Sequence, residues 1–174
     1  MRIAVCDDNK NDRIELCELL KIVWPGTEFF LFDDGQDLLA QIDVGETYDL
    51  VFLDIFMQKI GGIEAGKKIR EFHPEMEIVL VSISREFGPE AFELNAFYYL
   101  VKPYQKELLW KIKERFQKKV VSKLTIYDVS SKQEQEVPYQ KITYIESMHN
   151  YLYIHMATGA VIKVRESLQM FMTN

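Results

Sequence analysis

The chain of 174 residues has little cysteine, no long apolar run and no excess of basic residues. Cys6 and Cys17 are its two cysteines, and each falls among apolar residues, so we expect two buried thiols rather than a disulfide. No apolar run approaches the roughly 18 residues that a membrane-spanning helix needs. The opening MRIAVCDD is typical of a strand followed by acids, not of a signal peptide. These absences predict a cytoplasmic protein with no membrane partner.

The charge is unevenly distributed along the chain. Residues 1–119 contain 16 Lys and Arg against 22 Asp and Glu, so this segment carries the whole net charge of −6. Residues 120–174 contain five residues of each sign. Neither segment has the basic excess that is usual in nucleic-acid-binding domains, which weakens any prediction of DNA binding.

The first 119 residues alternate between strand and helix patterns. We expect apolar strands at 1–6, 27–32, 48–53, 77–81 and 97–101, and helices at 11–24, 34–42, 63–72, 89–94 and 105–119. In the first helix, Ile14, Cys17, Leu20 and Trp24 share the face expected to be buried. Five strand–helix units predict an α/β fold with a doubly wound, five-stranded parallel sheet, flavodoxin-like in its strand order 2-1-3-4-5.

Polar residues stand where four of these strands should end. Asp7 and Asp8 follow the first strand, Asp54 follows the third, Ser82 the fourth and Lys102 the fifth. Because the carboxyl ends of parallel strands form one rim, we expect these side chains to converge there. Three close carboxylates repel one another unless a cation lies between them. Each motif alone also suits a helix cap, a turn or a loop, but together they predict a site for a divalent metal and an anionic group.

In the order and spacing of these motifs, residues 1–119 resemble the receiver domain of bacterial response regulators, the CheY-like family. The resemblance implies that Asp54 accepts a phosphoryl group from a phosphohistidine of a sensor histidine kinase. It implies a signalling domain that slowly removes its own phosphate, not an enzyme. A metal-dependent phosphatase is disfavoured, because its chemistry would be supported by an Asp at position 56, where this chain has Phe56.

The family's cofactor is Mg²⁺, which prefers oxygen ligands. By the resemblance, Asp8, Asp54 and the backbone carbonyl of Phe56 hold the ion, and Asp7 acts through water. The bulky Phe56 near the path of an attacking water predicts slow self-dephosphorylation. Gln58 replaces a proline that is usual in the family's loop after the phosphorylation site, so we expect that loop to be less rigid.

The resemblance also implies a switch. Lys102 and the hydroxyl of Ser82 meet the phosphoryl oxygens, and Tyr99 matches the family's switch aromatic, which rotates inward when Ser82 moves. The face formed by 89–94, 97–101 and 105–119 then docks a partner or a second copy. The alternative is that Tyr99 merely packs on the sheet. The Lys102–Pro103 bond is expected to be cis, as in relatives.

Beyond residue 119 the pattern becomes one of short strands, expected at 124–129, 134–138, 143–146, 151–156 and 161–164, with a helix beginning at 167–172. Residues 141–168 resemble the opening of a LytTR-type DNA-binding domain. We therefore expect a receiver domain at 1–119 and a partial, apparently truncated LytTR-type domain at 120–174.

By that resemblance, His149 and Asn150 lie in a loop that faces DNA, and Lys163 or Arg165 meets phosphate. The alternative for His149 and Asn150 is a plain polar turn. The expected function is a two-component response regulator that acts on promoter DNA if its output domain is complete, and that forms a phosphorylation-promoted homodimer. The alternative is a stand-alone receiver whose tail is a dimerisation arm without DNA binding.

Overall fold

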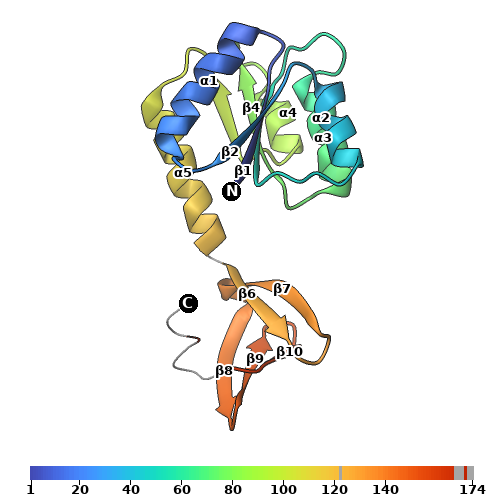
Figure 1. Cartoon of the computed structure of the whole chain (residues 1–174), viewed down its shortest axis with the longest axis vertical. Coiled ribbons are helices and arrows are strands. Elements are labelled where there is room, and N and C mark those ends of the chain that lie inside the picture. Colours follow the sequence, from blue (N-terminus) through green and yellow to red (C-terminus); the bar gives the residue numbers. More distant parts are fainter. Residues whose placement is uncertain (122, 167–170, 172–174) are drawn as a thin grey trace. The chain divides into compact units, whose positions relative to one another are not determined.

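The computed structural model of the chain describes residues 1–121, 123–166 and 171 (Figure 1). The chain forms two compact units, Met1–Lys113 and Glu114–Asn174, whereas the sequence predicted a boundary after residue 119. Among the described residues, none of the helices combines the length and the apolar composition needed to cross a bilayer.

The first unit is built on one parallel sheet in the order β2-β1-β3-β4-β5. Its strands are β1 (Arg2–Cys6), β2 (Glu28–Phe32), β3 (Leu50–Asp54), β4 (Glu77–Ser82) and β5 (Tyr98–Val101). The helices that alternate with them are α1 (Lys10–Val23), α2 (Gly35–Asp43), α3 (Gly62–Phe72), α4 (Gly88–Glu93) and α5 (Lys106–Val121). The predicted α/β fold and strand order are therefore confirmed, with helix ends that differ by one or two residues from the prediction.

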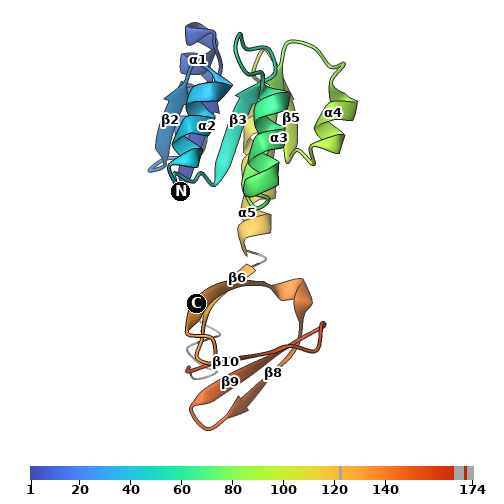
Figure 2. The same ribbon diagram turned by 90° about the vertical axis from the view of Figure 1, so that its right-hand side faces the viewer.

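Helices cover both faces of this sheet, with α1 and α5 on one side and α2, α3 and α4 on the other (Figures 1 and 2). Ala4 and Cys6 of β1 belong to the core under α2 and α3, together with Val51 and Leu53 of β3. Since side chains alternate along a strand, the fully buried Phe52 between them faces α1 and α5. Burial on both faces explains why β3 is apolar up to its last residue.

One detail of α1 differs from the prediction. Ile14 was expected in the buried face, but it is 44% exposed. The buried residues of α1 are Leu16, Cys17, Leu20 and Val23. Because this stripe is centred on Leu16 and Leu20, Ile14 lies beyond its edge, next to Cys17 on the exposed side. Cys6 and Cys17 are both free and buried, as predicted.

The register of the strands brings the polar strand ends to one rim. Cys6 of β1 pairs with Leu53 of β3, so Asp7 and Asp54 are level with each other. On the other side of β3, Asp54 pairs with Val81, and the next residue, Ser82, pairs with Val101. Lys102 follows directly. The parallel register thus places all these side chains within about one residue of the same sheet edge.

The second unit is antiparallel throughout its described strands. β6 (Lys123–Asp128) pairs with β7 (Gln133–Pro138), and after the short helix η1 (Tyr139–Lys141) come β8 (Ile142–Met148), β9 (Tyr151–Met156) and β10 (Val161–Val164). These last three form a sheet in the order β10-β9-β8. The predicted β-rich C-terminal segment is confirmed. Of the helix expected at 167–172, residues 167–170 and 172 lie outside the described residues.

This unit has its own small core, which the two sheets share. Its buried members are Leu124, Ile126, Val137, Leu152, Ile154, Ile162, Val164 and Phe171. Asp128, at the end of β6, joins the two sheets, because its carboxylate accepts hydrogen bonds from the amides of Ser130 at 2.9 Å and of Lys163 at 3.4 Å. Such hydrogen bonds, first that of Ser130, lower the pKa of Asp128.

Candidate phosphoacceptor site

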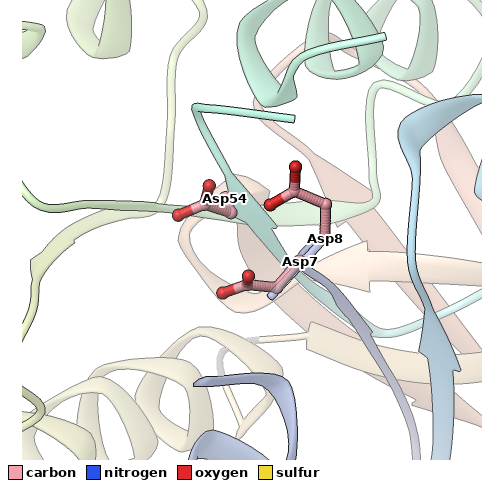
Figure 3. Close-up of side chains that lie close together, drawn as sticks. All are labelled: Asp7, Asp8 and Asp54. Atoms are coloured by element: carbon pink, nitrogen blue, oxygen red, sulfur yellow. The ribbon is translucent and has the colours of Figure 1, made fainter. Parts of the chain in front are cut away.

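Three carboxylates meet where β1 and β3 end (Figure 3). Asp7 and Asp8 follow β1, and Asp54 is the last residue of β3. One oxygen from each carboxylate lies within 4.8 Å of the others. Asp7 and Asp54 are buried, at 2% and 4% exposure, and Asp8 is exposed. The predicted acidic residues therefore form one cluster with an open side.

Lys102 supplies the positive charge of this rim. Its Nζ lies 2.8 Å from Oδ2 of Asp7, 2.7 Å from Oδ2 of Asp12 and 3.0 Å from Oδ1 of Asp54. Burial of the side chain opposes its charge, but the hydrogen bonds to carboxylates, first that of Asp12, outweigh this effect and raise the pKa of Lys102. It is therefore an ammonium in this site. The Lys102–Pro103 peptide bond is cis, as predicted.

Asp54 has one satisfied and one unsatisfied oxygen. Its Oδ2 accepts a hydrogen bond from the amide of Phe56 at 3.0 Å. Its Oδ1 is buried and accepts no hydrogen bond from any described residue, although Lys102 lies within ion-pair distance. Burial raises the pKa of the Asp54 carboxyl to about 6, while Lys102 opposes the rise. At neutral pH the group is mostly ionised, with a lone pair available to a cation or an electrophile.

The donor set fits Mg²⁺. The ion prefers hard oxygen ligands and commonly takes one or two carboxylates while keeping several waters. Asp8 and Asp54 each turn a carboxylate oxygen toward the cluster, and the unsatisfied Oδ1 of Asp54 is an atom that still needs a partner. Asp7 is held by Lys102, consistent with the indirect role expected for it. The carbonyl of Phe56 was the expected third ligand, and the backbone amide of Phe56 donates a hydrogen bond to Oδ2 of Asp54.

The loop after Asp54 is anchored by a residue of another element. Asp34, the N-cap of α2, accepts a hydrogen bond from Gln36 at 2.8 Å, as caps do. The same carboxylate accepts hydrogen bonds from the amides of Lys59 at 3.0 Å and Ile60 at 3.4 Å. The loop that carries Gln58 in place of a proline is thus tied to α2 by a side chain that is 4% exposed.

The helix after this loop begins very close to Asp54. A Cβ built on Gly62, the first residue of α3, would lie 2.3 Å from the carbonyl oxygen of Asp54. A side chain at this position would push α3 away from the end of β3. Glycine therefore permits the close approach that keeps the loop short.

Two of the expected switch residues, Ser82 at the end of β4 and Tyr99 in β5, share a hydrogen-bond partner, Ser84, in the segment after β4. Ser82 is fully buried, and its Oγ accepts a hydrogen bond from the amide of Ser84 at 3.1 Å. The hydroxyl of Tyr99 donates to the carbonyl of Ser84 at 2.6 Å. The ring of Tyr99 also packs against the core under α2 and α3. A movement of Ser82 would therefore shift Ser84 and, through the hydrogen bond to its carbonyl, the hydroxyl of Tyr99.

An aromatic pair stands beside the acidic cluster. Phe56, 47% exposed, meets Phe87 edge-on, with ring centroids 5.2 Å apart and an interplanar angle of 81°. Phe56 follows Asp54 by two residues, and Phe87 precedes α4. The pair joins the loop after β3 to the loop after β4.

The four residues expected to meet DNA lie at one end of the sheet β10-β9-β8. His149 and Asn150 form the exposed turn between β8 and β9, and His149 has a φ of 56°. Lys163 of β10 places Nζ 4.1 Å from the ring centroid of Tyr151. Arg165 follows β10, whose C-terminal end lies beside the start of β9 because the two strands are antiparallel. Their contact with DNA stays a prediction.

Sequence reasoning missed two residues of the rim. Asp12 contacts Lys102, but an acid in the first turn of a helix is so common that the sequence gives no separate signal. Asp34 lies in an Asp-Asp-Gly run that indicates a turn and a helix cap, and nothing in that run indicates contact with Lys59 and Ile60.

The doubly wound sheet and its acidic rim with a partly buried lysine define a class of α/β signalling domain. The response regulator receiver domain family matches residues 3–114, and the chain belongs to this family. Among curated proteins, it is 32% identical over 109 residues to the sensory transduction protein LytR of Staphylococcus haemolyticus, covering 62% of this chain and 41% of that one. It is 31% identical over 129 residues to the transcriptional regulatory protein YpdB of Escherichia coli, covering 72% and 52%.

Solved structures agree. The response regulatory domain of MrkE from Klebsiella pneumoniae matches with a TM-score of 0.63 and 29% identity, covering 68% of this chain and 97% of that one. The response regulator TrrA of Thermotoga maritima, in complex with Mg²⁺ and beryllofluoride, matches with a TM-score of 0.58 and 33% identity, covering 66% and 97%. The chain spans about half the length of the curated relatives it matches, and the family match ends at Glu114, the first residue of the second unit.

Proposed function

We propose that this chain is a two-component response regulator, phosphorylated on Asp54 by a sensor histidine kinase, that regulates transcription through a LytTR-type output domain. The observation that carries the proposal is the buried Oδ1 of Asp54, which has no hydrogen-bond donor among the described residues and faces a lysine and two further carboxylates. The homologues LytR and YpdB, by their names a sensory transduction protein and a transcriptional regulator, support the same direction.

The transfer needs little from the protein beyond alignment and charge balance. An oxygen of Asp54 attacks the phosphorus of a phosphohistidine, the P–N bond breaks and the kinase histidine leaves, so that Asp54 becomes an acyl phosphate. Lys102 and the hydroxyl of Ser82 then meet the phosphoryl oxygens, as the family resemblance implies. This receiver is a phosphoryl acceptor that slowly loses its phosphate, not an enzyme acting on an external substrate.

Mg²⁺ fits the cluster of Asp7, Asp8 and Asp54. The family resemblance implies the carbonyl of Phe56 as a further ligand. When bound, the ion supplies charge neutralisation and orientation of the phosphoryl oxygens. The chain's own residues hold Asp54 in place, because Phe56 donates to its Oδ2 and Gly62 packs against its carbonyl.

The phosphoacceptor role is tested by exposing the protein to acetyl phosphate with Mg²⁺ and measuring its intact mass. Wild type should gain one phosphoryl group, and Asp54→Asn should gain none. Asp43→Asn removes the same charge from the exposed last residue of α2, far from the rim, and should behave as wild type. Phosphate uptake by Asp54→Asn equal to that of wild type would exclude Asp54 as the acceptor.

The output activity is the less supported half of the proposal. His149, Asn150, Lys163 and Arg165 gather at one end of the sheet β10-β9-β8, which suits contact with promoter DNA. The alternative is a receiver that acts through phosphorylation-dependent protein contacts, its tail a dimerisation arm, and the near-neutral charge of the second unit favours this alternative. A gel shift with promoter DNA, with and without phosphorylation, separates the two.

A phosphorylation-promoted homodimer and a cytoplasmic location remain predictions of the sequence. The dimer is tested by sedimentation of the protein with and without beryllofluoride and Mg²⁺. A sedimentation coefficient that stays constant across both conditions would remove the homodimer from the proposal.

A further inference from the structure

The ammonium of Lys102 is shared with a carboxylate outside the acidic cluster. Asp12 lies in the first turn of α1, and its Oδ2 accepts a hydrogen bond from Nζ of Lys102 at 2.7 Å. This contact is at least as short as the 2.8 Å hydrogen bond to Asp7. Asp12 does not belong to the group of Asp7, Asp8 and Asp54 that could hold a metal.

The hydrogen bonds that Lys102 donates go to Asp7 and Asp12 and not to Asp54. An ammonium has three N–H donors. Lys102 donates to Asp7 and Asp12, whereas Asp54 Oδ1, at 3.0 Å, accepts no hydrogen bond from the described part of the chain. Asp12 therefore takes one donor of the ammonium and helps to fix Nζ where it lies 3.0 Å from Oδ1 of Asp54 without the geometry of a hydrogen bond to that oxygen.

We propose that Asp12 is a positioning residue that retains Lys102 in the resting state and releases it to the phosphoryl oxygens when Asp54 is modified. The proposal rests on the phosphoacceptor function proposed above. It assigns a role that the cluster alone does not explain, because an ammonium already bound to Asp7 has no need of a further carboxylate to stay in the site.

Asp12 is the partner that can release Lys102 most easily. Its side chain is 31% exposed, against 2% for Asp7, so water can solvate its carboxylate after the hydrogen bond breaks. Its place in the first turn of α1 also stabilises a negative charge there, through the helix dipole. Asp7, by contrast, would be left as a buried and unpaired charge.

This role predicts effects of opposite sign for a cation and an anion. Asp12→Asn removes one negative charge near the cluster and frees Lys102 to donate to Asp54. Mg²⁺ alone should then bind more weakly, because Lys102 competes for Asp54 Oδ1. Beryllofluoride, measured at saturating Mg²⁺, should bind more tightly, because Lys102 is no longer retained. For a partly exposed ion pair we expect about threefold to fivefold in each direction.

The control is Asp37→Asn. Asp37 is an exposed acid in the first turn of α2, so the variant has the same change in net charge and the same type of helix position, without an ion pair to Lys102. Mg²⁺ and beryllofluoride are titrated calorimetrically into wild type and both variants, and thermal unfolding confirms that each is folded. Lysine-ammonium ¹H–¹⁵N spectra, recorded without metal or beryllofluoride, report on Lys102 directly.

The expected result is a set of opposite affinity changes in Asp12→Asn, little change in Asp37→Asn, and a shifted Lys102 ammonium signal in Asp12→Asn alone. The inference is overturned by any other pattern in Asp12→Asn, including two weakened affinities, two unchanged affinities or an unmoved ammonium signal. If wild type binds no beryllofluoride, the proposed function itself fails. If wild type binds it and Asp12→Asn matches Asp37→Asn, the failure belongs to the Asp12 inference alone.

Discussion

Replacing Asp34 by Ala should loosen the loop that follows the phosphoacceptor. The Asp34 carboxylate serves three backbone amides, those of Gln36 in α2 and of Lys59 and Ile60 in the loop after Asp54. Truncation leaves all three without this acceptor. The change thus removes a helix cap and a long-range tether at once, in a side chain that is buried.

The magnitude follows from these contacts. Loss of an N-cap costs about 1 kcal/mol, and hydrogen bonds to a charged acceptor are worth about 1.5–3 kcal/mol each. The contact with Ile60 is long, at 3.4 Å, and Lys59 is exposed, so water can partly replace the carboxylate. We therefore expect the free energy of unfolding of the first unit to fall by about 2–4 kcal/mol.

Both tryptophans, Trp24 and Trp110, lie in the first unit, so tryptophan fluorescence in urea reports on that unit. Asp33→Ala is the matched control, because this neighbouring acid is exposed and should change stability by less than about 0.5 kcal/mol. A value for Asp34→Ala within that range of the control would refute the tether. Beryllofluoride binding should also weaken in Asp34→Ala and not in the control.

Three further predictions follow from the same rim. Burial would raise the pKa of Asp34, but the hydrogen bonds from backbone amides outweigh burial and lower this pKa. The ionised carboxylate therefore stabilises the fold fully above about pH 4, and this stabilisation is lost as the pH falls below that value. The stability difference between wild type and Asp34→Ala should accordingly shrink on acidification. Gly62→Ala should destabilise by about 1–3 kcal/mol, because its Cβ would lie 2.3 Å from the carbonyl oxygen of Asp54, whereas Gly88→Ala, with no atom within 4 Å, should not; equal urea midpoints would contradict this. Phe56→Asn should shorten the lifetime of the phosphorylated protein, measured as phosphate release, and unchanged decay would argue against shielding by the ring.

The sequence predicted the fold because each strand of the first unit is apolar to its end and is followed by a helix pattern. The same regularity located the rim, since a polar residue directly after an apolar strand can only lie at the sheet's carboxyl edge. Where the prediction failed, as at Ile14, the predicted and the observed buried faces of α1 share Cys17 and Leu20 and differ in the apolar residues beside them. Packing against the sheet decides between them, and that information is not local.

The contacts that complete the site were beyond sequence reasoning for a related reason. Asp12 and Lys102 are 90 residues apart, and Asp34 and Lys59 are 25 apart. Each of these acids has a sufficient local explanation as a helix-terminal residue. Only the three-dimensional structure shows that Asp12 also accepts a hydrogen bond from Lys102 and that Asp34 also accepts one from the amide of Lys59.

The balance of charge at the rim argues for an order of binding and predicts the effect of removing metal. Asp7, Asp12 and Asp54 lie within ion-pair distance of the ammonium of Lys102, Asp8 completes the acidic cluster, and the guanidinium of Arg13 donates to the backbone carbonyl of Asp7. These six groups carry a formal charge of −2 when all are ionised. An anionic phosphoryl group is repelled from such a site until a divalent cation has entered it. Chelation of Mg²⁺ by EDTA should therefore abolish beryllofluoride binding. Added NaCl should not restore binding, because mobile ions screen buried charges poorly. Beryllofluoride binding that persists in EDTA, or returns with NaCl alone, would mean that Lys102 suffices for the anion and that the acidic cluster has another purpose.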